Sequence, residues 1–283
     1  MIKYPKGKKF SLCLTHDVDR IKKSHQYLTY FLKSKNIYHL KSFFSKKDPY
    51  WNFEKIIEIE NKYKVKSTFF FLNESEKFKL LNPKNWKVSL GRYNITKEKV
   101  KNIIKKLDNE GWEIGVHGSY NSFKDYDLLK KEKTQLEKII DHKIIGVRQH
   151  YFNLNNNTWK LQSKTGFKYD SSFGFNDGNI GFFNNKYIPF NPIKNKEFLV
   201  LPNTIMDWCL MGKKNVEDEY MKIIDIAEER NAVLTINWHQ RVFNEKEFPG
   251  YSETYEKIIK ECKKRGAWIG KCIDIYKLFK HSK

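Results

Sequence analysis

Two carboxylates and a histidine directly follow the first apolar run of the chain. In the stretch SLCLTHDVDR, residues 11–20, these groups stand where a hydrophobic strand would end. On a regular strand Asp17 and Asp19 point to the same face, and Val18 points the opposite way into apolar packing. His16 then points away from Asp17, so we interpret it first as a packing residue. One carboxylate of such a pair can hold a divalent metal ion while the other transfers a proton, because the cation offsets their mutual repulsion.

Other ionisable residues follow other apolar runs in the same way. They are His117, Arg148, His150, Asp170, Asp207 and His239. The carboxyl ends of parallel strands converge on one face of an α/β barrel, where sites are built. We therefore expect all these residues to share one site, whose composition suits a divalent metal ion together with acid–base catalysis.

Strand-like apolar runs alternate with amphipathic helical segments along the chain. We expect strands within 9–19, 66–72, 112–119, 143–151, 168–175, 197–207, 232–240 and the start of 267–280. We expect helices within 53–64, 96–111, 124–140, 158–166, 216–230, 251–266 and the end of 267–280. This alternation predicts βαβ units and a mainly parallel sheet that closes into a barrel, in a single domain over residues 1–283.

Three stretches interrupt the alternation: 24–50, 73–95 and 174–197. They read as irregular insertions, and long loops inside a compact domain usually form lids or binding loops. We expect substrate specificity to depend on them.

The composition is strongly basic, with a formal net charge of +21. The lysines are spread over almost every predicted helix, and no zinc finger or RNA-recognition consensus is present, so we predict solvated surface charge and no specific nucleic-acid partner. Peripheral contact with an anionic membrane, or an acidic substrate, stays open as an alternative. No apolar stretch is long enough to span a bilayer.

The first residues lack the apolar core of a signal peptide, so we expect a cytoplasmic protein. The four cysteines are scattered without a CxxC pair, which favours reduced thiols over disulfides or a zinc ribbon.

Four motifs, taken in order, resemble those of the polysaccharide deacetylases, the NodB-like group of carbohydrate esterase family 4. They are THDVD, EIGVHGSYN, GVRQHY and INWH, and the resemblance covers nearly the whole chain. THDVD resembles the family's first motif in the variant that spaces its two aspartates by one residue. The resemblance implies an α/β fold, a single distorted (β/α)7 barrel with loop insertions. It also implies a divalent metal ion, Zn²⁺ first, with Co²⁺, Mn²⁺ or Ni²⁺ as alternatives.

By this resemblance Asp17 is the general base, and Asp19 and His117 are metal ligands. Asn121 stands at the third ligand position, where the family usually has histidine. Because an amide oxygen binds zinc more weakly than an imidazole, His16 and His150 remain alternatives for that ligand. His150 shares a strand face with Arg148 and is expected to line the substrate site. The alternative for Asn121 is a helix N-cap.

The remaining roles follow from the same resemblance. Arg148 orients the base, the backbone N–H of Tyr151 contributes to an oxyanion hole, and His239 is the general acid. Asp170, in the stretch YDSS, lines the cleft. Asp207 orients His239 and also belongs to the expected substrate site.

The resulting hypothesis is a metal-dependent hydrolase that removes an acetyl group from an N-acetylated sugar of a surface polysaccharide or its precursor, of the capsule or O-antigen type. Nucleotide-linked or lipid-linked sugars would be its substrates. Two alternatives remain: a non-catalytic carbohydrate-binding relative of the deacetylases, and a metal-independent cyclic amide hydrolase on the same fold. The hypothesis of a nucleic-acid-processing protein is supported only by the positive charge.

Overall fold

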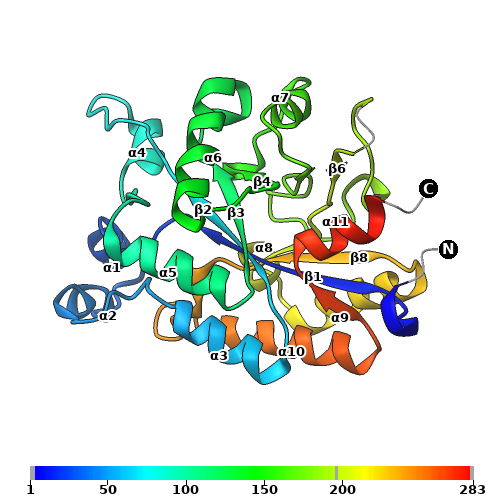
Figure 1. Ribbon diagram of the computed structural model, residues 1–283. Helices are drawn as coiled ribbons and strands as arrows, with labels where there is room; N and C mark the ends of the chain where they lie inside the picture. Colours follow the sequence, from blue (N-terminus) through cyan, green and yellow to red (C-terminus); the bar gives the residue numbers. More distant parts are fainter. Residues whose placement is uncertain (1–3, 195–196, 281–283) are drawn as a thin grey trace.

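The strands form one curved parallel sheet (Figure 1). The structure is a computed structural model and describes residues 4–194 and 197–280. Its strands are β1 (Ser11–Val18), β2 (Thr68–Leu72), β3 (Glu113–Gly118), β4 (Gly146–Gln149), β5 (Tyr169–Asp170), β6 (Leu199–Val200), β7 (Ile205–Met206), β8 (Val233–Asn237) and β9 (Trp268–Gly270). They lie in the order β6-β5-β4-β3-β2-β1-β8-β7, and β9 also pairs with β1. The sheet curls into a half-barrel flanked by helices, which confirms the predicted α/β class and is consistent with the distorted (β/α)7 barrel.

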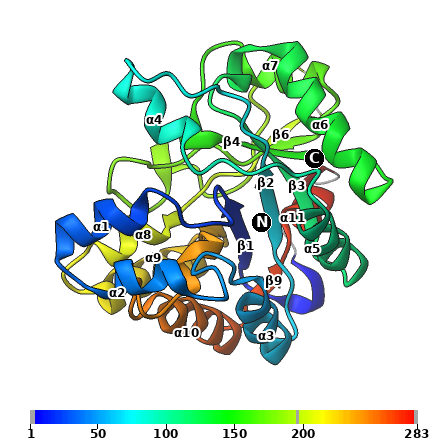
Figure 2. The same cartoon turned by 90° about the vertical axis from the view of Figure 1, so that its left-hand side faces the viewer.

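Helices cover both sides of the sheet (Figures 1 and 2). The α-helices are α1 (Gln26–Ser34), α2 (Tyr38–Lys41), α3 (Phe53–Tyr63), α4 (Pro83–Ser89), α5 (Glu98–Asn109), α6 (Tyr126–Ile140), α7 (Thr158–Lys164), α8 (Asp207–Met211), α9 (Val216–Glu229), α10 (Tyr251–Lys264) and α11 (Cys272–Lys280). Short 3₁₀ turns are η1 (Pro5–Gly7), η2 (Ser42–Phe44), η3 (Ser122–Lys124), η4 (His150–Phe152), η5 (Phe183–Asn185) and η6 (Gln240–Phe243).

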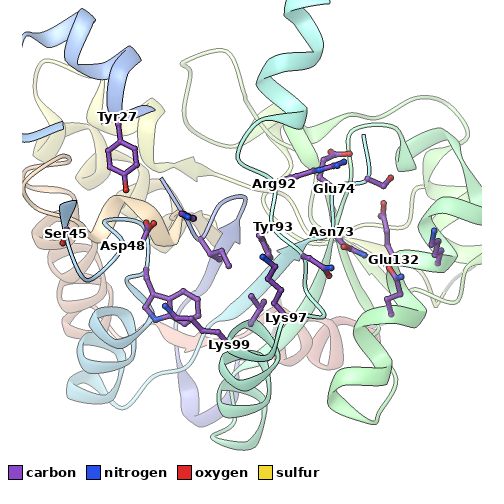
Figure 3. A pocket seen from close by; sticks show the side chains of 18 of the residues that line it. Tyr27, Ser45, Asp48, Asn73, Glu74, Arg92, Tyr93, Lys97, Lys99 and Glu132 are labelled. Atoms are coloured by element: carbon purple, nitrogen blue, oxygen red, sulfur yellow. Dashed lines mark hydrogen bonds between the residues drawn. The ribbon is translucent and has the colours of Figure 1, made fainter. Parts of the chain in front are cut away.

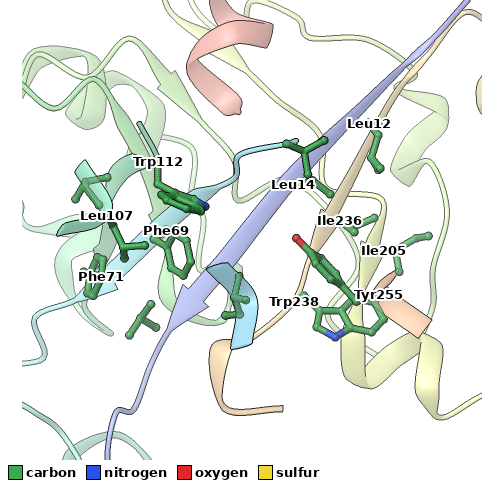
Figure 4. Close-up of a cluster of buried hydrophobic side chains, with 14 of the residues drawn as sticks. Leu12, Leu14, Phe69, Phe71, Leu107, Trp112, Ile205, Ile236, Trp238 and Tyr255 are labelled. Atoms are coloured by element: carbon green, nitrogen blue, oxygen red, sulfur yellow. The ribbon is translucent and has the colours of Figure 1, made fainter. Parts of the chain in front are cut away.

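The central strand β1 is buried along its whole length. It pairs with β2 on one side and β8 on the other, and such two-sided burial is why its apolar residues run almost without interruption. In Figure 4 Leu12, Leu14 and Ile236 lie among the buried side chains. Each fully buried side chain of this kind contributes about 1.5–3 kcal/mol. The core therefore fixes the strand ends that carry the polar residues.

Two of the three predicted irregular insertions are partly helical. The stretch 24–50 contains α1, α2 and η2, and the stretch 73–95 contains α4. The prediction of irregular structure there is wrong because these helices are short, and Leu28 and Leu32, one turn apart on α1, face solvent rather than the core. In the third stretch, residues 195 and 196 lie outside the described residues, as do 1–3 and 281–283 of the predicted domain.

The single strand expected over 197–207 is instead two short strands. β6 pairs with β5, whereas β7 pairs with β8, so the chain passes from one end of the sheet to the other between them. The four cysteines are free and buried, as predicted. None of the helices that the structure describes is long and apolar enough to cross a membrane.

Candidate active site

The carboxyl ends of the strands bring most of the predicted residues to one pocket of about 610 Å³. Its lining includes Asp17, Asp19, His117, His150, Tyr151 and His239. Arg148 and Asp207 lie behind it in direct contact with two of these residues. The convergence on one face follows from the parallel order of the strands.

Asp17 is a buried carboxylate whose two oxygens are both held. Arg148 Nη1 donates to its Oδ1 at 2.9 Å, and Asn237 Nδ2 donates to its Oδ2 at 2.6 Å. Burial alone would raise the pKa of Asp17, but the positive charges of Arg148 and His117 outweigh it and hold the pKa below its usual value. The carboxylate is therefore ionised and fixed in orientation.

The Arg148 guanidinium is completely buried. Besides Asp17 it donates from Nε to the backbone oxygen of Ser171, from Nη2 to Ser171 Oγ and from Nη1 to Thr15 Oγ1, at 2.8–2.9 Å. It also lies over the Phe70 ring, 4.5 Å from the centroid. A buried cation with this many partners is a rigid support for the carboxylate beside it.

Asp19, His117 and His150 form a group whose ligand atoms all lie within 4.8 Å of one another. Asp19 Oδ1 is 3.2 Å from His117 Nε2 and 3.8 Å from His150 Nε2. This oxygen is buried and has no hydrogen-bond partner within the described residues. The other oxygen, Oδ2, accepts from Arg241 Nη1 at 2.9 Å, so Asp19 offers a single oxygen to the group.

The chemistry of these donors fits a divalent cation. His117 Nδ1 lies 2.9 Å from the backbone oxygen of Arg148 and donates to it in the neutral ring, which leaves the Nε2 lone pair toward Asp19 Oδ1. Burial lowers the pKa of His150 to about 4, against the opposing charge of Asp19, so its ring is neutral at physiological pH. Burial also opposes charge on His117, but the carboxylates of Asp17 and Asp19 raise its pKa, so a proton and a cation compete for the same lone pair. Two imidazoles and one carboxylate suit Zn²⁺ and its neighbours in the first transition series.

Asn121 is not among the residues that line the active pocket. Its Nδ2 donates to Glu76 Oε1 at 2.6 Å, and its position is the N-cap of η3, although its side chain makes no capping bond. His16, the other alternative, is fully buried on the opposite face of β1. Its ring nitrogens lie 2.6 Å from the Trp238 backbone oxygen and 2.9 Å from Glu60 Oε1. Of the two histidine alternatives for the third ligand, the structure brings His150 to Asp19 and His117 and holds His16 elsewhere.

His239 is held by Asp207 from behind. Asp207 Oδ2 accepts from His239 Nδ1 at 2.9 Å and from the His239 backbone N–H at 2.7 Å. The opposite nitrogen, Nε2, faces the pocket 3.5 Å from Asp19 Oδ2. Burial alone would lower the pKa of His239, but the charge of Asp207 raises it above its usual value. The arrangement favours an imidazolium that presents its Nε2 proton to the pocket.

The backbone at Tyr151 is in an uncommon conformation. Tyr151 and Phe152 both have positive φ, 57° and 55°, in the left-handed region that non-glycine residues rarely adopt. The Tyr151 ring stacks on His150 with centroids 4.3 Å apart. Such backbone strain is often found at binding and catalytic sites, and here it turns the chain at the edge of the pocket.

Asp170 does not line the pocket. It is fully buried and accepts from Ser172 Oγ at 2.6 Å, from the Ser172 backbone N–H at 2.9 Å and from Gln162 Nε2 at 2.9 Å. Its position at the end of β5 was predicted, but in the structure its side chain braces the turn after that strand.

Sequence reasoning missed Asn237 and Arg241, which contact the two aspartates. Both lie two residues from His239, one before it and one after it. For Asn237, the last residue of β8, the alternation of side chains along a strand was the available signal. Arg241 lies in η6, where strand alternation gives no signal.

A second cavity of about 850 Å³ shares a lining residue with the active pocket, and Figure 3 shows side chains that line this second cavity. Arg92 lines both cavities, and Tyr93 of the larger one donates from its Oη to the Val18 backbone oxygen at 2.7 Å. Its lining includes six cationic side chains: Lys22, Lys46, Arg92, Lys97, Lys99 and Lys131. None of the six is within ion-pair distance of a carboxylate of the described residues, in contrast to other surface lysines such as Lys9 and Lys168. The cavity therefore has an excess of positive charge.

The acidic residues of that cavity offset only part of its charge, because two carboxylates, Asp48 and Glu74, face six cations. Asp48 and Glu74 accept backbone N–H groups, at 2.9–3.0 Å. Burial raises the pKa of Glu132 to about 8, so this carboxyl is mostly protonated at neutral pH.

No protein-family model and no curated protein matches the sequence. Solved structures match it over almost its full length. A putative polysaccharide deacetylase from Mycobacterium smegmatis matches over 98% of this chain and 92% of its own, with a TM-score of 0.66 and 17% identity. The chain has the fold of the polysaccharide deacetylases. The Bc1960 peptidoglycan N-acetylglucosamine deacetylase also matches, over 96% and 90% of the two chains, with a TM-score of 0.53 and 16% identity.

The polysaccharide deacetylase fold also occurs without activity. A pseudoenzyme of carbohydrate esterase family 4 from Bacillus anthracis matches over 96% of this chain and 66% of its own, with a TM-score of 0.50 and 14% identity. A mutant of that protein has restored enzymatic activity. Activity within this fold therefore depends on individual site residues.

Proposed function

We propose that the protein is a metal-dependent hydrolase that removes the acetyl group from an N-acetylated sugar of a surface polysaccharide or its precursor. The observation that carries the proposal is the placement of two separately supported proton-transfer groups in one pocket. Arg148 holds Asp17 ionised and Asp207 holds His239 as an acid, and both lie in the pocket that also contains Asp19, His117 and His150.

Each residue has a defined part in this reaction. Asp17 takes the proton of the attacking water, and Arg148 and Asn237 keep the carboxylate aimed at it. The backbone N–H of Tyr151 donates to the carbonyl oxygen as negative charge develops on it. His239 gives its Nε2 proton to the leaving amine, so that amide and water become acetate and a free amino sugar.

Asp19, His117 and His150 would hold the cation, for which we propose Zn²⁺ first and Co²⁺, Mn²⁺ or Ni²⁺ as substitutes. Such a cation polarises a carbonyl and lowers the pKa of a water molecule. Asn121 has no part in this assignment.

We propose a phosphate-bearing substrate, either a nucleotide-linked or a lipid-linked sugar. The six cations of the adjoining cavity lack carboxylate partners within the described residues, and Arg92 lies between that cavity and the active pocket. Its volume is within the range of cavities that bind nucleotide-sized groups. These precursors are available in the cytoplasm, where we propose that the reaction occurs.

The test is acetate release by the full chain loaded with Zn²⁺ or Co²⁺. Candidate substrates are UDP-N-acetylglucosamine, a prenyl-diphosphate-linked N-acetylglucosamine and the uncharged N,N′-diacetylchitobiose. We expect release from at least one charged substrate, with a lower KM than for the uncharged one. Acetate release from none of a broad set of acetylated sugars, together with measurable sugar binding, would instead support a non-catalytic binding protein, the alternative that the pseudoenzyme neighbour favours.

A further inference from the structure

Most of the exposed large apolar side chains lie at one end of the molecule. Of the fourteen in the described part of the chain, nine lie within two segments. We call residues 24–47 the α1 segment and residues 77–97 the α4 segment. The α1 segment exposes Leu28, Leu32, Ile37, Phe43 and Phe44.

The α4 segment exposes Phe78, Leu80, Leu81 and Trp86. Leu81 is 95% exposed, and Phe44 of the α1 segment is 84% exposed. Isolated exposed apolar residues are common, but a concentration of this kind marks an interaction surface.

Both segments lie at the end where the active pocket opens. In Figures 1 and 2, α1, α2 and α4 project from the same side of the sheet. Thr29 and Lys33 of the α1 segment line the active pocket, and so do Leu90 and Arg92 of the α4 segment. The two segments that carry the exposed apolar residues thus also contribute to the lining of the active pocket.

The charge of these segments is one-sided. The α1 segment contains five lysines, and the α4 segment contains five lysines and Arg92; neither contains aspartate or glutamate. Bulky apolar residues among lysines, without acidic residues, are typical of surfaces that lie in the headgroup region of anionic bilayers.

The α1 segment is fixed to the body of the protein. Lys23, just before it, is fully buried, and its Nζ donates to Glu247 Oε2 at 2.6 Å and lies 2.9 Å from His39 Nδ1. Tyr50 Oη donates to the other oxygen of Glu247 at 2.9 Å. The exposed residues of the α1 segment are therefore held against the body of the protein by these buried contacts.

We propose that the α1 and α4 segments form a docking surface for an anionic lipid bilayer, with the active pocket facing the membrane. A second copy of the chain would place two strongly basic surfaces against each other, which is electrostatically unfavourable. An acidic phospholipid surface supplies both the negative charge and an apolar layer for Phe44 and Leu81. This inference does not depend on the proposed deacetylation, because it concerns only the surface around the pocket.

The test is co-sedimentation of the full chain with vesicles made of equal parts phosphatidylcholine and phosphatidylglycerol. We expect binding to these vesicles, little binding to pure phosphatidylcholine and weaker binding as salt is raised. The triple variant Phe44→Ser, Leu80→Ser, Leu81→Ser should reduce the partition coefficient by about tenfold or more. The charge variant Lys41→Glu with Lys79→Glu should reduce binding to the anionic vesicles in the same direction.

Matched controls use exposed residues elsewhere. Ile188→Ser with Ile226→Ser tests apolar residues, and Lys105→Glu with Lys138→Glu tests charge; neither pair should change vesicle binding by more than about twofold. Absence of binding to the anionic vesicles would overturn the proposal. So would equal losses in the test and control variants, or a dimer in solution that the triple variant dissociates. Melting curves confirm that each variant is folded, and the assay needs no turnover.

Discussion

The active pocket and the docking surface formed by the α1 and α4 segments (the α1–α4 surface) lie next to each other but have opposite physical properties. In the site, charged groups such as Asp17 and Arg148 are buried, and each has partners within the chain. On the surface, apolar side chains such as Leu81 and Phe44 are exposed, and the two segments contain lysines but no acidic residue. The fold itself supplies the partners of the buried charges in the pocket, whereas the exposed apolar side chains have to find theirs outside the chain.

The largest effect is expected where a buried charge loses its support. Arg148→Met removes the only arginine that contacts Asp17 among the described residues. The buried carboxylate of Asp17 then has little positive charge beside it. We expect unfolding in urea to show a loss of about 3–5 kcal/mol. Arg92→Met, at the exposed boundary of the two cavities, should change stability by less than about 0.5 kcal/mol. Equal losses in the two variants would contradict the contrast between the regions.

The second prediction separates the ligand candidates. His150→Ala should weaken Zn²⁺ binding by at least about a hundredfold, because loss of a ligand exceeds the effect of losing a residue that only orients one. Asn121→Ala should leave Zn²⁺ affinity within about threefold, since its amide donates to Glu76. Competition with a chromophoric chelator measures both. A larger loss for Asn121→Ala than for His150→Ala would return the third ligand position to the asparagine.

The third prediction concerns the buried carboxyl of Glu132, whose pKa burial raises from 4.5 to about 8. The folded state binds this proton more tightly than the unfolded state, so its contribution to stability is complete below pH 4.5 and is lost as the pH rises toward 8. Glu132→Gln should remove that decline, which amounts to about 2 kcal/mol or more between pH 5 and pH 8. Urea unfolding at both pH values provides the measurement; parallel pH profiles for wild type and variant would disprove it.

The smallest effect on stability is expected on the α1–α4 surface. Leu81→Ser should change the free energy of unfolding by less than about 0.5 kcal/mol, because the side chain packs against almost nothing. In the core, Leu14→Ala should cost about 2–5 kcal/mol. If Leu81→Ser destabilised the protein as much as Leu14→Ala, Leu81 would be a structural residue rather than part of a docking surface.

The active pocket could be predicted well from the sequence, because the buried core requires a regular alternation of side chains along the strands that carry it. Alternation along β1 separates Asp17 from His16, and the structure confirms that His16 points into a buried network on the other side. The parallel direction of the strands was also predicted, and it is what brings His239 and His117 to the same end of the sheet.

The rest depends on features that periodicity does not encode. Asn121 was assigned by analogy with a motif, but the direction of its side chain is set by Glu76, which lies far from it in sequence. The α1 segment was expected to be irregular because its apolar residues, Leu28 and Leu32, face outward. Residues that serve an external partner do not follow the pattern of a core.

The central claim is that Asp17 is the base of a metal-dependent deacetylation, and the most direct measurement is acetate release by Asp17→Asn loaded with Zn²⁺. The amide retains the size of the carboxylate, and Asp19, His117 and His150 are unchanged, so the zinc content should equal that of the wild type. We expect kcat to fall by about 10²–10⁴-fold. Undiminished turnover by the zinc-loaded variant would contradict the claim.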